Sequence, residues 1–241
     1  MHDPPLCWPH LLQAKQAMAE LYLVRHGQAS LGADDYDRLS AIGERQGIWL
    51  GEYFAQRDIA FDRVMAGTLR RHAQTVDAIW RGLGAPPVEC EVHPGLDEYD
   101  FHALFRALGD QHADLAQRAT GSSRDFFKAL RQVLHLWAEG ALDDCAPETW
   151  RAFQQRVADA RAAIQHGGGQ RVLVVSSGGV IAALTQQILH APAETAIALN
   201  MQIRNSSVSH YFFNRDTLQL SSFNGIGHLD DPQRRAFQTY G

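Results

Sequence analysis

The chain has 241 residues, of which 45% are hydrophobic and 20% charged, and this composition excludes global disorder. Its 22 basic and 27 acidic residues leave a net charge of −5, which provides no long-range field for nucleic acid or an anionic membrane. Three cysteines without a Cys-x-x-Cys pair argue against a disulfide scaffold and against a thiolate zinc site. We therefore expect a cytoplasmic protein that binds neither nucleic acid nor a membrane.

The first residues differ in character from the rest of the chain. Residues 1–17 contain several prolines and precede Met18, which stands just before the first strong strand signal. They have neither the basic start nor the apolar run of a secretory signal, and the apolar runs of the chain are far too short to span a membrane. We expect a flexible N-terminal extension over residues 1–17 and one domain over residues 18–241.

Strand and helix signals alternate along that domain. Short apolar runs predict buried strands at residues 21–24, 61–65, 88–92 and 171–176. Apolar residues at helical spacing predict helices at residues 39–56, 69–80 and 178–190, with Thr68 as the N-cap of the second. The stretch from about 99 to 165 is mostly helical in pattern and ends at three glycines, 167–169. Two further runs, 208–213 and 218–223, flank a hairpin signal.

This alternation predicts a three-layer α/β/α sandwich with a mostly parallel sheet. The terminal hairpin adds one antiparallel strand, because strands joined by a short turn run in opposite directions. The helical stretch at about residues 99–165 is expected to be an insertion that caps the ligand pocket.

Three of the predicted strand-to-helix turns carry residues suited to binding an anion. Arg25-His26-Gly27 follows the first strand, Arg70-Arg71 follows the second, and Ser176-Ser177-Gly178-Gly179 follows the fourth. Glycines at a helix N-terminus present free N–H groups to a phosphate, and arginines add charge-assisted hydrogen bonds. Each turn alone is most often surface decoration, but ligands of open α/β sheets bind where such turns converge. A neutral histidine there can attack phosphorus.

Five motifs in chain order resemble those of the histidine phosphatase superfamily, which has the phosphoglycerate-mutase-like fold. They are Leu21 to Gln28 with the Arg-His-Gly signature; Leu39, Ser40, Gly43 and Gln46; Leu69, Arg71, Gln74 and Thr75; Leu96, Glu98, Asp100 and Phe101; and Val174 to Ile181. Together they cover residues 20–228, and five motifs in register are far more specific than any one of them.

The resemblance implies a phosphomonoesterase that acts on a small phosphorylated substrate without a metal or another cofactor. It makes His26 the nucleophile that becomes phosphohistidine and Glu98 the general acid for the leaving alkoxide. It assigns phosphate binding to Arg25, Arg71, Ser177 and Gly178, with Gln28 as a further candidate. Because neighbouring helix residues point about 100° apart, Arg71 rather than Arg70 is expected to face the phosphate.

Two positions depart from the family pattern. Ser177 stands where the family has its second catalytic histidine, and Gly32 stands where it often has asparagine. Losing one preorganised donor costs about 2.7–4 kcal/mol, or roughly 10²–10³ in rate. A relocated histidine is one way to restore it: His102 lies four residues after Glu98 and would share its face on a helix. His72, beside Arg71, is a weaker candidate.

Two other functions stay open at this point. A phosphoglycerate mutase is disfavoured, because only twelve residues separate His26 from Leu39 and no Arg-x-Tyr-Gly-x-Leu run follows Glu98. An inactive phospho-ligand or protein-binding module on the same fold is favoured by Ser177, but such a module needs neither a nucleophile nor an acid. The sequence offers no ligand cluster for metal catalysis.

Overall fold

The computed structural model describes residues 18–30 and 37–240. The predicted N-terminal extension, residues 1–17, and the Gly32 position lie outside the described residues.

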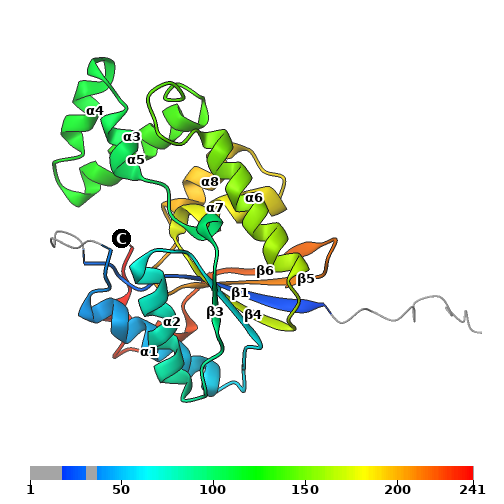
Figure 1. Ribbon diagram of the computed structural model, residues 1–241. Helices are drawn as coiled ribbons and strands as arrows, with labels where there is room; N and C mark the ends of the chain where they lie inside the picture. Colours follow the sequence, from blue (N-terminus) through cyan, green and yellow to red (C-terminus); the bar gives the residue numbers. More distant parts are fainter. Residues whose placement is uncertain (1–17, 31–36, 241) are drawn as a thin grey trace, which may run out of the picture.

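A six-stranded sheet in the order β3-β2-β4-β1-β5-β6 forms the centre of the fold (Figure 1). Its strands are β1 (Ala19–Arg25), β2 (Arg63–Ala66), β3 (Cys90–Val92), β4 (Arg171–Ser176), β5 (Val208–Phe213) and β6 (Leu218–Gly225). The first four run parallel, whereas β5 is antiparallel to both β1 and β6. The prediction of a mostly parallel sheet with one antiparallel strand is therefore confirmed.

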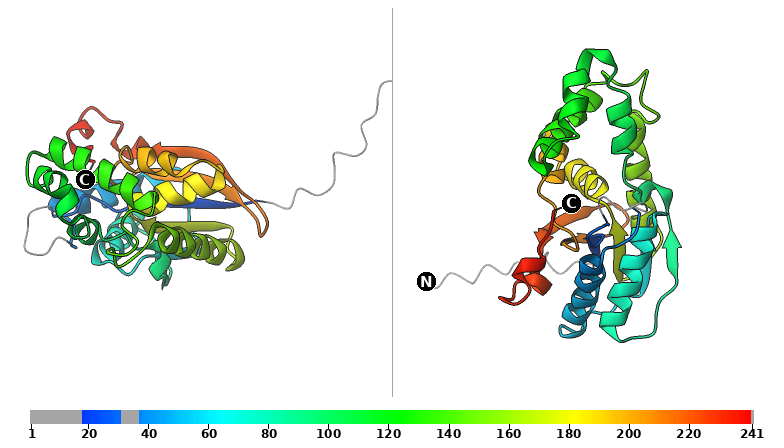
Figure 2. Two further views of the ribbon diagram at one scale, coloured as in Figure 1. Left: turned by 90° about the horizontal axis from the view of Figure 1, so that it is seen from above. Right: turned by 90° about the vertical axis from the view of Figure 1, so that its left-hand side faces the viewer.

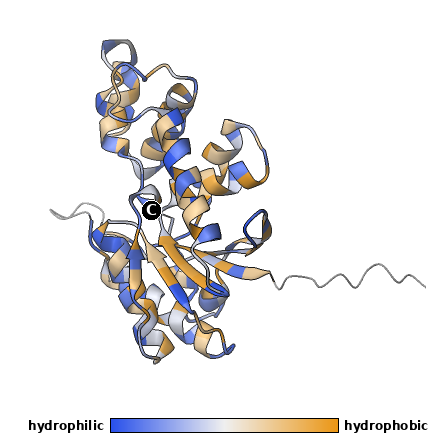
Figure 3. Ribbon diagram, turned by 45° about the vertical axis from the view of Figure 1, so that its right-hand side comes forward, coloured by the Kyte–Doolittle hydropathy of each residue, from blue (hydrophilic) through white to orange (hydrophobic). Residues whose placement is uncertain are grey.

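Side chains of the central strands alternate between two apolar cores, as period-two geometry requires. In β1, Leu21 and Leu23 enter one core, and Val24 enters the other. In β4, Val174 and Val175 divide in the same way. Burial on both faces explains why these strands are continuous apolar runs rather than alternating ones, and Figure 3 shows this hydrophobic centre.

Helices cover both faces of the sheet (Figures 1 and 2). Helices α1 (Ala41–Ala55) and α2 (Arg70–Leu83) share one core with the sheet. The other core includes α6 (Trp150–His166) and α7 (Gly178–Ile188), with α5 (Ser123–Ala138) and α8 (Ala193–Asn200) packed beside them. Short helices α3 (Phe101–Arg106) and α4 (Ala113–Arg118) lie farther from the sheet. The three-layer sandwich is confirmed.

The chain between β3 and β4 is helical, as its pattern predicts. It is not all peripheral, because Val157, Ala160 and Ile164 of α6 pack in the core beside the sheet. Gly168 and Gly169 have φ values of 80° and 91°, so the chain leaves α6 through a left-handed turn that favours glycine. That this stretch caps a pocket stays a prediction.

The prediction that Thr68 caps the second helix is wrong. The N-cap of α2 is Leu69, which makes no side-chain cap bond. The backbone N–H and the hydroxyl of Thr68 donate instead to the Asp97 carboxylate, at 2.6 and 2.5 Å. A charge-assisted bond to a distant residue thus outweighs the local cap. None of the helices in the described part of the chain is long and apolar enough to cross a bilayer.

Candidate active site

His26 follows β1 at the carboxyl end of the sheet and is only 4% exposed. Its backbone N–H donates to the Ser176 carbonyl at 2.9 Å, which ties it to β4. Its Nδ1 lies 2.7 Å from the Gly27 carbonyl oxygen, which can only accept a hydrogen bond. This bond assigns the ring proton to Nδ1 and leaves the lone pair on Nε2.

The surroundings of His26 keep its imidazole neutral. Burial lowers the pKa of His26 well below its ordinary value, and the positive charges of Arg71 and Arg25 lower it further. A neutral imidazole with its lone pair on Nε2 is a nucleophile over the whole physiological pH range.

Arg71, on the first turn of α2, faces that lone pair. Its Nε–H donates to His26 Nε2 at 3.2 Å, and its Nη1 donates to Asp37 Oδ1 at 2.8 Å. The neighbouring Arg70 is exposed, so Arg71 and not Arg70 contacts His26. Arg25, at the end of β1, donates from Nη1 to the Ile203 carbonyl oxygen at 2.5 Å.

Glu98 lies at the N-terminus of α7. Its Oε2 accepts the Gly179 N–H at 3.1 Å, and its Oε1 accepts the Tyr99 N–H at 3.3 Å. A Cβ at position 179 would collide with Glu98 Oε1, so only glycine admits this approach. Burial of the carboxyl raises the pKa of Glu98, although the Gly179 N–H and the charges of Arg71 and Arg25 act in the opposite direction.

The residue next to Glu98 anchors it to the helical layer. Tyr99 packs against Trp137 and Phe153, with ring centroids 5.4 and 5.8 Å apart, and its hydroxyl accepts from Asn200 Nδ2 at 2.9 Å. The segment that carries Glu98 is therefore held against α5, α6 and α8, and the Glu98 side chain is held against α7.

Ser177 and Gly178 stand at the junction of β4 and α7. Ser177 is the N-cap residue of α7 and is fully buried, and Gly178 is the first residue of that helix. A Cβ at position 178 would lie 3.6 Å from Arg25 Nε, so this turn reaches the arginine that follows β1. The Ser177 hydroxyl lies 2.7 Å from His72 Nε2.

Two further candidates from the sequence, Gln28 and His102, make their contacts with residues other than His26. The side-chain oxygen of Gln28 accepts the Ser40 hydroxyl at 2.8 Å, so it supports the start of α1. His102 is exposed and stacks on Phe101, with ring centroids 4.0 Å apart. The expectation that His102 shares a helical face with Glu98 is wrong, because α3 begins at Phe101 and is capped by Asp100.

The structure also brings in residues that the sequence reasoning missed or left aside. His72 contacts Ser177, and its ring centroid is 5.7 Å from that of His26. Asp97 lies 3.9 Å from His72 Nδ1, and Asp37 binds Arg71. Asp97 stands between the motif residues Leu96 and Glu98, which is a signal that could have found it. Asp37 lies in a loop and carries no such signal.

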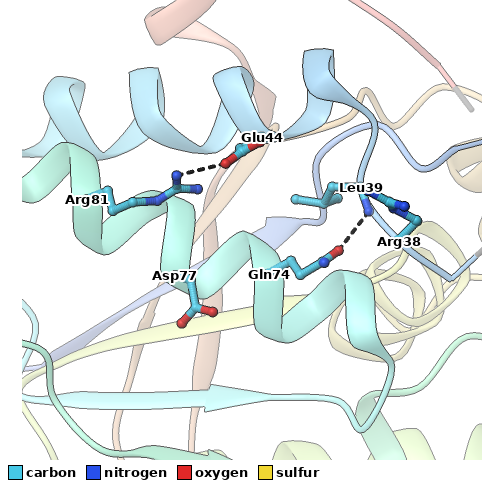
Figure 4. A pocket seen from close by; sticks show the side chains of 6 residues that line it. All are labelled: Arg38, Leu39, Glu44, Gln74, Asp77 and Arg81. Carbon is cyan, nitrogen blue, oxygen red and sulfur yellow. Dashed lines mark hydrogen bonds and ion pairs between the residues drawn. The ribbon is translucent and has the colours of Figure 1, made fainter.

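A separate open groove of about 430 Å³ lies between α1 and α2 (Figure 4). It is lined by Arg38, Leu39, Glu44, Gln74, Asp77 and Arg81. Gln74 there holds the Leu39 N–H at 2.8 Å, and Arg81 pairs with Glu44 at 2.7 Å. These lining residues are not among the hydrogen-bond partners of the His26 ring, so the groove is separate from the His26 cluster. Among residues 18–30 and 37–240, no group of three histidine, cysteine or carboxylate side chains could hold a metal ion.

The fold and the site together define a class of protein. Proteins of this class have a buried neutral histidine beside two arginines and a carboxyl group, at the carboxyl ends of the strands of an α/β sheet. Ligands of such sheets bind at these strand ends, and arginines there can bind a phosphate group. The chain belongs to the histidine phosphatase superfamily (branch 1), whose family model matches residues 21–225. The resemblance seen in the sequence motifs is thereby confirmed.

Solved structures share the fold across nearly their whole length. The chain superposes on a phosphoglycerate mutase from Bacillus anthracis with a TM-score of 0.64 at 19% identity, covering 88% of this chain and 95% of the other. An alpha-ribazole phosphatase from Shigella flexneri gives 0.60 at 24% identity, covering 86% and 96%. A phosphoserine phosphatase from Entamoeba histolytica gives 0.60 at 18% identity, covering 88% and 100%. At these identities the likeness shows the fold alone. No curated protein matches the chain at a significant level.

Proposed function

We propose that the protein is a phosphomonoesterase that acts through a phosphohistidine on His26. One observation carries the proposal: the His26 ring is fixed by the Gly27 carbonyl so that its Nε2 lone pair meets the Arg71 guanidinium at 3.2 Å. A phosphoryl group held by Arg71 is thereby held against the nucleophilic atom. This is the positioning and charge stabilisation on which phosphoryl transfer depends.

In the first step, His26 Nε2 attacks phosphorus, and the bond from phosphorus to the leaving oxygen breaks. The leaving alkoxide takes a proton from Glu98, whose raised pKa favours the protonated form. Arg71 and Arg25 stabilise the charge on the phosphoryl oxygens. The products are the free alcohol and phosphohistidine.

In the second step, water attacks phosphorus and gives its proton to the Glu98 carboxylate. Phosphate leaves, His26 Nε2 regains its lone pair, and Glu98 is protonated again. Every proton and electron pair is supplied by the chain, the substrate or water, so we expect turnover without added metal. The substrate that we propose is a small phosphomonoester, the class to which the phosphoserine bound by one structural neighbour belongs.

Ser177 is the observation that favours a second candidate, an inactive module that binds a phosphorylated ligand. The deciding experiment is hydrolysis of p-nitrophenyl phosphate in EDTA, with rapid acid-free quenching to trap phosphate on the protein. We expect turnover and an acid-labile label on wild type, and neither on His26→Ala. The control is His166→Ala, which removes an exposed histidine at the end of α6. Full activity of His26→Ala would refute the mechanism, and an inactive wild type that still binds phosphate would favour the module.

A further inference from the structure

We propose that the Ser177 hydroxyl and the His72 imidazole together replace the second histidine of this family, with Ser177 as the donor to the phosphoryl group and His72 as the residue that positions and polarises it. The inference rests on the proposed phosphatase function. It explains how a site with serine at this position can still supply a strong donor beside the nucleophile.

Contact geometry is the first support. His72 Nε2 and Ser177 Oγ are 2.7 Å apart, and both side chains are 0% exposed. His72 follows Arg71 on α2, so one helix turn directs a guanidinium at His26 and an imidazole at Ser177. The His26 and His72 rings lie 5.7 Å apart, centroid to centroid. The pair is thus next to His26.

The second support is the carboxylate behind His72. Asp97 Oδ1 lies 3.9 Å from His72 Nδ1, and the Asp97 carboxylate is fixed by two bonds from Thr68. A Cβ at position 67 would collide with both His72 Nδ1 and Asp97 Oδ1, so Gly67 leaves the space between them open. His72 Nδ1 is buried and has no hydrogen-bond partner among the described residues. A serine, a histidine and an aspartate are therefore arranged in a row, and the ring of its histidine lies 5.7 Å from that of His26.

The direction of the hydrogen bonds decides what this row can do. A hydroxyl has one proton, so Ser177 can donate to a phosphoryl oxygen only while His72 Nε2–H donates to Ser177 Oγ. Burial and, after it, the Arg71 charge disfavour the charged imidazole, whereas a carboxylate such as Asp97, 3.9 Å from Nδ1, attracts a proton to that nitrogen. A phosphoryl dianion offsets the Arg71 charge, so it shifts His72 toward the form that donates from Nε2 and faces Asp97 with Nδ1–H. The donor is then strongest when negative charge develops on the phosphoryl group.

Single and combined substitutions of His72 and Ser177 test the proposal most directly. His72→Ala and Ser177→Ala should each lower kcat for p-nitrophenyl phosphate on the order of 10²-fold, with KM changed by less than about threefold. The double alanine variant should be no worse than either single one, because each removes the same donor. Ser177→His alone should also lose activity, since 2.7 Å leaves no room for a second imidazole. His72→Ala with Ser177→His should recover most of the lost kcat, because the alanine vacates the space that the new ring needs.

The chain contains a matched control. His228 and Ser206 form another buried pair, with Nε2 and Oγ 2.7 Å apart. His228→Ala should lower the melting temperature about as much as His72→Ala and leave kcat within threefold of wild type. If His72→Ala does not fold, Ser177→Ala is the smaller change and should show the same loss of kcat.

The outcomes separate this inference from the function on which it rests. A wild type that turns over, together with His72→Ala at wild-type kcat, overturns the role of His72 and leaves the phosphatase intact. Equal loss of kcat in His72→Ala and His228→Ala would assign both losses to packing and would also overturn it. A wild type without turnover or His26 label refutes the phosphatase and, with it, this inference.

Discussion

His26 is held from two sides that are built differently. On its ring side lie Arg71, His72, Asp97, Glu98 and Ser177; the pKa values of His72 and Glu98 are displaced by burial and by nearby charge. On its backbone side lie Gln46, Asn205, Ser206 and Thr239, which hydrogen-bond to the His26 carbonyl or to one another. Behind them, His228 contacts the Ser206 hydroxyl.

On the backbone side, the polar groups are joined by hydrogen bonds that begin at the His26 carbonyl. The His26 carbonyl accepts from the Ser206 N–H at 3.2 Å and from Asn205 Nδ2 at 3.3 Å. Thr239 Oγ1 donates to Asn205 Oδ1 at 2.9 Å and accepts from Gln46 Nε2 at 3.0 Å. Satisfied networks of this kind make a position rigid. We conclude that the backbone side fixes where His26 lies and the ring side, whose buried charges cost stability, supplies reactivity.

The largest expected effect is on the ring side, at Glu98. Glu98→Gln should lower kcat by about 10²–10⁴, the range for loss of a general acid. Because the pKa of Glu98 is raised, its proton is present above the ordinary range of a carboxyl and is lost as pH rises through the raised pKa. The wild-type profile should therefore fall on its alkaline side, and this fall should be missing from Glu98→Gln. Glu139→Gln, an exposed control, should keep the wild-type profile; an unchanged profile in Glu98→Gln would remove Glu98 from the acid role.

The next effect compares two adjacent arginines on α2. Arg71→Ala should lower kcat/KM roughly 10²–10³-fold, because it removes a charged donor at the reacting phosphoryl group. Arg70→Ala should stay within about threefold, since this side chain is exposed. Steady-state kinetics on both variants is sufficient. The reverse ranking would overturn the assignment of the ring side.

A backbone-side change should act on stability instead. Gln46→Ala removes bonds to the Gln28 N–H, the Phe237 carbonyl and Thr239 Oγ1. We expect a loss of about 2–3 kcal/mol in the free energy of unfolding by urea, as for several buried hydrogen bonds. Activity per folded molecule should stay within threefold. Gln155→Ala, at an exposed position of α6, is the control and should leave both quantities unchanged. A large fall in kcat for Gln46→Ala would contradict the division between the two sides.

The smallest expected effect is a fall in the free energy of unfolding at acidic pH, to which a histidine on each side of His26 contributes. Burial lowers the pKa of His72 and that of His228 to about 3, with Arg71 and Arg234 adding to the shift. Both side chains take up a proton near pH 6.5 when unfolded but not when folded, so acidification below pH 6.5 favours the unfolded chain. Each should cost on the order of 1–2 kcal/mol between pH 7 and pH 5. Glu98 acts with the opposite sign, because its pKa is raised on folding.

Urea unfolding at the two pH values checks this prediction. His72→Gln and His228→Gln should each reduce the acid-induced loss by a similar amount, although only the first should change kcat. A loss between pH 7 and pH 5 that neither substitution reduces would show that these histidines are not the source.

The order of strands and helices, and the position of His26 and Arg71 at the ends of strands, can be predicted from the amino-acid sequence alone. Period-two and continuous apolar runs predict β1, β4, β5 and β6 closely, because the local pattern of apolar residues reflects which faces of a strand are buried. The third strand is an exception: it is limited to Cys90–Val92, since it pairs only with β2 at the sheet edge. The turns after β1 and β2 place His26 and Arg71 at one end of the sheet, which follows from parallel topology alone.

Only the tertiary structure shows which histidine lies beside His26. His72 and Ser177 are 105 positions apart, and no local pattern states that α2 and the start of α7 bring them within 2.7 Å. The sequence favours His102 over His72 on the assumption of a helix through Glu98, but the Asp100 cap starts α3 after Glu98, and His102 is exposed. Thr68 likewise does not cap α2 as expected, but donates hydrogen bonds to Asp97. For Thr68, a local capping preference of about 1 kcal/mol gave way to a contact with a distant segment, which only the folded chain determines.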